Sequence, residues 1–260
     1  MPSVRPNPNH GAYTDRLIFN GNNLSDYCIC RMERAILPSV VNVVQDIPGR
    51  HGALFRSSRL GTYIQPVHIW LRTQDRREVS EVKHRLAAML YADEPKPLYL
   101  PDEKGLYYLA ILDGDSGLGE ITSDIPETTL NFLICDPIAY GIRRSARVRS
   151  YDGDTPINAG GSWPSYPLIK VLASGVTANG ITITNRTTGE FIRITNETAG
   201  GIPDDSYIYI DTDAERVWLP EYDNETIGVT AESDFFTLDA NTVINCYNCW
   251  ADFEWRERWL

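Results

Sequence analysis

Apolar and polar residues alternate along several short segments of the first half of the chain, the pattern of half-buried β-strands. The clearest case is Tyr63–Leu71, where Val67 and Ile69 share one side with Leu71, while Ile64 and Trp70 lie on the other. Pro66 interrupts this segment, and because proline donates no ladder hydrogen bond, we expect an edge strand or a bulge. Further strands are predicted at 17–19, 27–31, 40–44, 98–100, 107–112 and 129–135.

One segment of the first half has the helical rather than the strand period. An amphipathic helix is predicted from Arg76 to about Tyr91, with a capping box formed by Asp75 and Glu78. The prolines that begin at Pro95 then end it. The apolar face of this helix is made by Val79, Val82, Leu86, Met89 and Leu90.

The second half contains only predicted strands and turns. The strands are short and are separated by Asn-Gly, Thr-Gly, Gly-Gly and Asp-Asn turns. This spacing predicts an all-β sandwich of jelly-roll type. The candidate strands are 168–172, 180–185, 191–195, 207–211, 216–219, 235–238, 242–246 and 253–259.

Charge divides the chain in the same way. Residues 1–150 hold 18 Lys and Arg against 17 Asp and Glu, whereas residues 151–260 hold 6 against 18. Such unequal halves indicate two folding units, so we predict domains at 1–145 and 146–260, with the boundary near Arg143–Arg149. Those four arginines are interpreted as a strand with a solvated face. The acidic total of -11 argues against a general DNA-binding protein.

The residues that usually carry chemistry are sparse. The four histidines have no neighbours that form a metal or triad motif, and no nucleotide-binding or hydrolase motif occurs. The prediction is therefore no catalytic, cofactor-binding or metal-binding residue, and no cofactor. Cys246 and Cys249 have the spacing of half a zinc site or a redox pair, although we interpret all five cysteines as small buried apolar residues.

Two weaker signals leave alternatives open. Asp113, Asp115 and Gly117 resemble the start of a calcium loop, but the later ligands of such a loop are missing, so we interpret the segment as a turn. Tryptophans gather in the second half and would suit sugar stacking if exposed, or the core if buried. A carbohydrate-binding module that recognises host cell-wall glycans is thus the main alternative function. A glycan-degrading enzyme is a second, less favoured alternative. These tryptophans are Trp163, Trp218, Trp250, Trp255 and Trp259.

The order of motifs resembles the phage distal tail protein (Dit) family of siphovirus-type bacteriophages over nearly the whole chain. The most recognisable piece is Asp136-Pro-Ile-Ala-Tyr-Gly141, which ends the first half. One departure is Asp239-Ala240, where the family usually has Pro-Gly before Asn241. The other matching segments are 46–53, 63–71, 97–110, 158–160, 166–171, 185–189, 207–211, 233–238, 241–244 and 255–259.

This resemblance implies a structural protein and not an enzyme. An α+β N-terminal domain, rich in strands with one helix, would form a hexameric ring, and a galectin-like C-terminal sandwich would point outward. The ring would join the tail tube protein to the tail-tip protein, often carry receptor-binding proteins, and let DNA pass in transit. The protein would lie at the tail tip of the virion after assembly in the host cytoplasm. No apolar run approaches the 20 residues of a membrane span.

Overall fold

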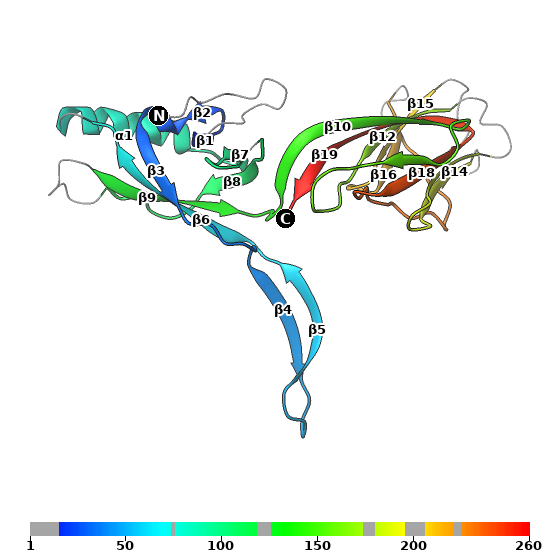
Figure 1. Ribbon diagram of the computed structural model, residues 1–260, viewed down its shortest axis with the longest axis horizontal. Coiled ribbons are helices and arrows are strands. Elements are labelled where there is room, and N and C mark those ends of the chain that lie inside the picture. The colour runs from blue at the N-terminus through cyan, green and yellow to red at the C-terminus, as the bar shows by residue number, and fades with distance from the viewer. Residues whose placement is uncertain are drawn as a thin grey trace. The chain divides into compact units, whose positions relative to one another are not determined.

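The computed structural model describes residues 16–73, 76–103, 105–118, 126–173, 180–195, 206–220 and 225–260. The chain forms two compact units, one of residues 1–140 with Leu260 and one of residues 141–259. The first is β-rich with one α-helix and the second is an all-β sandwich, as the sequence predicted (Figure 1). Among the described residues, no helix is long and apolar enough to cross a membrane.

A seven-stranded sheet in the order β2-β1-β7-β8-β9-β6-β3 forms the frame of the first unit. Helix α1 (Arg76–Leu90) packs on one face of this sheet through Val79, Val82, Leu86 and Leu90, four of the five predicted apolar positions. The strands are β1 (Ile18–Phe19), β2 (Asn22–Asn23), β3 (Cys28–Met32), β6 (Tyr63–Leu71), β7 (Lys96–Tyr99), β8 (Tyr108–Leu112) and β9 (Glu127–Ile134), and a 3-10 turn spans Leu24–Asp26.

Strand β6 shows the predicted faces but not the predicted position. Val67, Ile69 and Leu71 are buried, and Ile64 on the other side is half exposed. The expectation of an edge strand was wrong, because β6 pairs with β9 on one side and β3 on the other, and its pairing with β9 has no bulge. Pro66 is tolerated because the pairing with β3 stops at Val67, so the proline has a neighbouring strand on one side only.

The second unit is a sandwich of two antiparallel sheets. One has the order β10-β19-β12-β15-β16-β17 and the other β11-β18-β13-β14. Every second residue of these strands points into a shared apolar core, which explains the strict alternation of the sequence. The strands are β10 (Ala139–Arg149), β11 (Thr155–Ile157), β12 (Leu168–Ala173), β13 (Ile181–Asn185), β14 (Phe191–Ile194), β15 (Tyr207–Asp211), β16 (Arg216–Leu219), β17 (Glu225–Thr226), β18 (Thr242–Tyr247) and β19 (Cys249–Trp259).

One predicted strand of the second half does not form. Residues 235–238 contribute only the bridge between Leu238 and Ser165. Phe236 and Leu238 are buried in the sandwich core, so the apolar alternation was real. The alternation indicates only that every second side chain is buried. A segment can bury side chains in this way without a continuous ladder of backbone hydrogen bonds.

Candidate protein-interaction site

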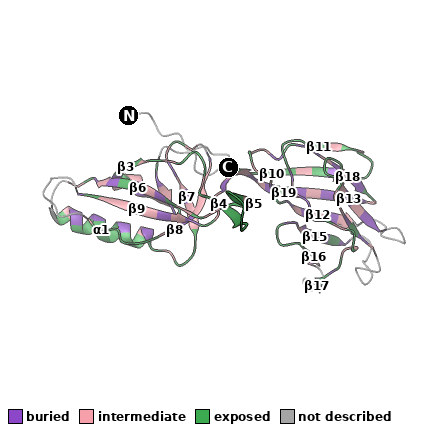
Figure 2. Cartoon of the chain, turned by 90° about the horizontal axis from the view of Figure 1, so that it is seen from below, coloured by how far each residue is buried: buried purple, intermediate pink, exposed green. Residues whose placement is uncertain are grey.

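A β-hairpin between β3 and β6 is the most unusual surface of the first unit. Within the part of the chain that the structure describes, strands β4 (Val40–Asp46) and β5 (Ala53–Leu60) pair only with each other, as a separate two-stranded sheet. Every residue of β4 is exposed, and Figure 2 shows both strands largely in green. A lone two-stranded hairpin is at best marginally stable in water, so this one requires support from outside its own strands.

The sequence predicted β4 but missed β5. Gly49 and Gly52, both with positive φ, allow the chain to reverse between the strands. A bulge follows Val43, because Val43 pairs with Ser57 while Val44 pairs with Phe55, leaving Arg56 as the extra residue. The Arg56 side chain donates to the Gln45 amide oxygen across the strands at 2.8 Å, which helps to fix the bulge.

Both faces of the hairpin carry exposed apolar side chains. Val44 and Phe55 form a cross-strand pair on one face and are 59% and 60% exposed. Val41 and Val43 lie on the opposite face and are 36% and 47% exposed. Solvated strands normally present polar residues on at least one face, so apolar side chains on both indicate a surface that another protein covers.

The base of the hairpin is held by a half-buried polar cluster. Arg34, which precedes β4, forms an ion pair with Glu103 and donates to the Pro101 carbonyl at 2.9 Å. The Tyr108 hydroxyl donates to Glu103 at 3.2 Å. Burial and the nearby Glu103 carboxylate raise the pKa of Tyr63, the first residue of β6, to about 12. The two strands that lead into and out of the hairpin are therefore tied to the sheet.

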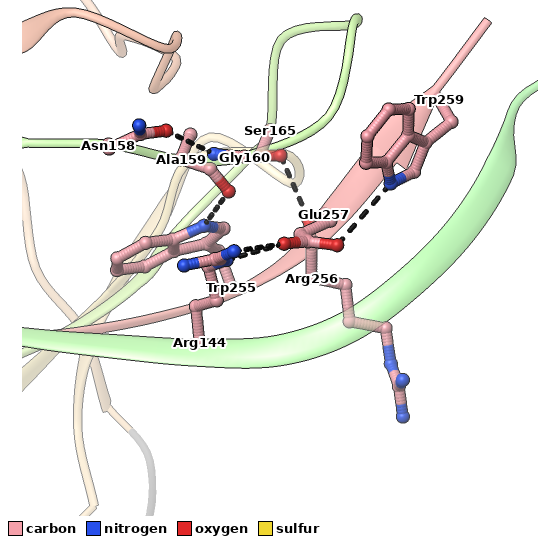
Figure 3. A network of polar contacts seen from close by, with 9 residues as sticks. All are labelled: Arg144, Asn158, Ala159, Gly160, Ser165, Trp255, Arg256, Glu257 and Trp259. Carbon is pink, nitrogen blue, oxygen red and sulfur yellow. Dashed lines mark hydrogen bonds and ion pairs between the residues drawn. The ribbon is translucent and has the colours of Figure 1, made fainter. Parts of the chain in front are cut away.

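A second polar network lies in the sandwich, where β10 and β19 meet (Figure 3). The carboxylate of Glu257, only 9% exposed, binds Arg144 at 2.5 Å and accepts from the Trp259 indole at 3.3 Å. The Trp255 indole donates to the Ala159 carbonyl at 2.8 Å. Side chains of β10 and β19 meet here, and Trp255 of β19 binds a backbone carbonyl of the loop after β11, so the network fixes that loop against the last strand.

Two glycines in and beside this network leave no room for a side chain. A Cβ at Gly141 would lie 2.7 Å from a Glu257 oxygen, and a Cβ at Gly161 would lie 2.1 Å from the Arg258 carbonyl oxygen. Gly161 also has a φ of +76°, which other residues rarely adopt. Close approach therefore favours glycine at both positions, and backbone conformation adds to this at Gly161.

The weaker sequence signals correspond to ordinary structural positions. Asp113 and Gly117 lie in the segment after β8, where the Gly117 carbonyl accepts from Thr128. Cys246 and Cys249 are buried at the end of β18 and the start of β19, and the hydrogen bond that the Cys246 thiol makes to Cys249, together with burial, raises the pKa of Cys246. The described residues contain no group of three or more potential metal ligands. Cys135 is exposed, contrary to the expectation that all five cysteines are buried.

Comparison with known proteins gives two family matches. A model of a phage tail protein RIFT-related domain matches residues 20–134, and a model of a siphovirus-type tail component, C-terminal domain, matches residues 160–259. The chain belongs to the siphovirus distal tail protein family. This is a structural family of phage tails and not a family of enzymes.

A solved structure of a distal tail protein supports this fold. The crystal structure of the Dit protein of phage SPP1, described as a paradigm of the hub adsorption apparatus in phages that infect Gram-positive bacteria, matches with a TM-score of 0.76. The two sequences are 18% identical, and the match covers 94% of this chain and 99% of that one. A chain of the phage P2 baseplate in its activated conformation with Ca matches with a TM-score of 0.44 and 9% identity, over 88% of this chain and 90% of that one. No curated protein sequence matches significantly.

Proposed function

We propose that this distal tail protein is the hub subunit of a phage tail tip, and that copies of it close into a ring, expected to be hexameric. The ring would join the tail tube protein to the tail-tip protein and carry receptor-binding components. It would be assembled in the host cytoplasm and lie at the tail tip of the virion. The observation that supports self-association best is the hairpin of β4 and β5, with uncovered apolar side chains on both faces.

Charge supports the first unit as the part that forms the ring. Residues 1–150 carry a net charge of +1, so several copies meet without strong mutual repulsion. Residues 151–260 carry -12, and crowding such surfaces around one axis would be unfavourable. An arm on one copy that binds a different surface of the next is a head-to-tail contact, which closes into a ring when the rotation per subunit fits.

A decisive experiment places a charge on the hairpin. Phe55→Asp should abolish or strongly weaken oligomers of the full chain, because burying a phenylalanine in an interface contributes about 1.5–3 kcal/mol per contact. Tyr247→Asp is the matched control, since Tyr247 is 51% exposed on β18 of the other unit. Light scattering after size-exclusion chromatography gives the mass. A wild-type monomer, or an oligomer unchanged by Phe55→Asp, contradicts the proposal.

Separate fragments test which unit associates. Fragment 1–148 should form the oligomer, and fragment 150–260 should stay monomeric at low and moderate salt. These boundaries also test the proposed division into domains at 1–145 and 146–260. An oligomeric C-terminal fragment beside a strictly monomeric N-terminal one would reverse the assignment.

DNA would pass through this ring without being held. Each phosphate contact adds affinity that falls steeply with salt, and several contacts would arrest a moving duplex. We therefore expect the assembled ring to bind duplex DNA weakly at physiological salt, which a fluorescence anisotropy titration measures. Tight and salt-sensitive binding would count against passage.

We also assign the chain no catalytic role. An activity on cell-wall polymers that one substitution abolishes would refute this assignment.

A further inference from the structure

The outward face of the six-stranded sheet in the sandwich combines aromatic rings with basic side chains. Alternate residues of these strands fill the core, so the residues between them point outward. We call one part of this surface, which is bordered by Asp211 and Glu254, the aromatic-basic face. It is made by Arg147 and Arg149 on β10, Trp250 and Asp252 on β19, Lys170 and Leu172 on β12, Tyr207 and Tyr209 on β15, and Arg216 and Trp218 on β16.

Strand register arranges these side chains in rows. Asp252 pairs with Lys170, Lys170 with Tyr209, and Tyr209 with Trp218, which makes one row across four strands. In a parallel row, Leu172 lies between Trp250 and Tyr207. Neighbouring members of a row are about 4.8 Å apart, the spacing of strands. An extended ligand that crosses the strands along the first row would thus meet a ring or a charge at every step, and along the second row it would meet two rings with Leu172 between them.

Within the described residues, two cations on this face form no ion pair, although both lie near enough to Asp252 to help lower the pKa of its carboxyl group. The Arg149 guanidinium lies 5.5 Å from the Trp250 ring and 5.7 Å from the Tyr151 ring, and its Nε is buried without a hydrogen bond. The Lys170 ammonium lies 4.0 Å from the Tyr207 ring, and within the described part of the chain it has no hydrogen bond or ion pair. Cation–π contacts position both groups, while their outer donors stay available for an anion.

Charge on this face differs from charge on the rest of the unit. Residues 141–260 contain ten Lys and Arg against eighteen Asp and Glu. Four of those ten basic residues lie on the aromatic-basic face, where Arg147 already pairs with Asp252. An anionic group is therefore attracted to this face and repelled by the remainder of the unit. A long, densely charged polymer such as DNA would still meet the acidic surroundings, which favours a ligand with fewer charges.

The combination of aromatic and charged side chains on this face favours a sugar over a protein as its ligand. The centres of protein–protein interfaces are enriched in aromatic residues and arginine but depleted of lysine and aspartate, whereas this face holds Lys170 and Asp252 among its rings. Sugars present apolar C–H faces that pack on aromatic rings, and acidic sugars add carboxylate or phosphate groups. Trp250 and Tyr207, 41% and 38% exposed, offer ring surface to such a ligand. Trp255, in contrast, is buried in the core.

We propose that the aromatic-basic face binds an acidic glycan of the bacterial surface, with sugar rings on Trp250 and Tyr207 and the acidic groups on Arg149 and Lys170. The proposal goes beyond the hub function and does not depend on ring formation. It gives the sandwich a direct part in contacting the host.

The full-length protein, fluorescently labelled, is applied to an array printed with acidic and neutral polysaccharides from bacterial capsules and cell walls. We expect binding to acidic glycans above neutral ones, reduced about tenfold by Lys170→Ala or Arg149→Ala, since a hydrogen bond between charged groups is lost. Arg193→Ala is the matched control, because it removes one exposed positive charge from β14 of the other sheet. Thermal unfolding of each variant checks that the sandwich is intact.

Several results would overturn the proposal. These are an array with no bound glycan, equal binding to acidic and neutral glycans, or binding that both alanine variants retain. A single-stranded oligonucleotide and the purified tail-tip protein are tested in parallel. If either binds through Lys170 and Arg149 while the glycans do not, the face serves nucleic acid or protein instead.

Discussion

The tightest backbone approach in the sandwich gives a sharp stability prediction. Gly161→Ala places a Cβ 2.1 Å from the Arg258 carbonyl oxygen, so the two segments must separate. That oxygen accepts hydrogen bonds from Ser162 and Trp163, both at 3.0 Å. Losing them costs about 1 kcal/mol each. The positive φ of the alanine adds about 1–2 kcal/mol, which gives a total of roughly 3–4 kcal/mol.

Gly153→Ala is the matched control for this substitution. Gly153 has a φ of +70°, close to that of Gly161, but a Cβ there would meet nothing within 4 Å. Gly153→Ala should therefore lower the free energy of unfolding only by the contribution of its positive φ, about 1–2 kcal/mol. For a unit of this size the difference between the two variants corresponds to a melting temperature about 8 °C lower for Gly161→Ala. Tryptophan fluorescence during thermal unfolding measures it, and equal shifts in the two variants would refute the reasoning.

Two further predictions concern single side chains. Arg147 holds the pKa of Asp252 below its usual range by hydrogen bonding and charge attraction. The ion pair therefore stabilises the fold above pH 4. This stabilisation is lost as the pH falls through the lowered pKa of Asp252. Arg147→Gln should therefore lower the free energy of unfolding by less than about 1 kcal/mol at pH 7, with no difference near pH 2, and urea titrations check this. Iodoacetamide at pH 8 should modify the exposed Cys135 before the buried Cys28, because burial raises the pKa of Cys28 to about 12. Mass spectrometry of the digested protein gives the order of modification.

Sequence patterns identified the buried side chains where one face of a segment packs on the core. The face of α1 with Val79, Val82 and Leu86 was correct because a helix on a sheet imposes a period of 3.6 on its apolar residues. The same reasoning failed for β5, whose sequence Ala-Leu-Phe-Arg-Ser-Ser-Arg-Leu has no alternation. Neither face of that strand is buried within the chain, so nothing imposed a period of two on it.

Contacts between distant segments could not be predicted from a single sequence. Arg144 and Glu257 are 113 residues apart, and their ion pair depends on β10 and β19 being neighbours in one sheet. The position of β6 inside its sheet is a similar case, because local pattern indicates a strand but not the number of its neighbours. The aromatic-basic face was visible only as a group of tryptophans, since strand register decides which of them lie outward and beside which cation.

The adjacency of β10 and β19 also has a consequence for how the sandwich can be exchanged. These strands run antiparallel, with Ser150 bonded to Cys249 at one end and Gly141 close to Glu257 at the other. The chain therefore begins and completes this unit at the same end of one strand pair. A replacement module would need to reproduce only that pair of ends, so we expect that another sandwich can be joined here while the first unit keeps its own sequence.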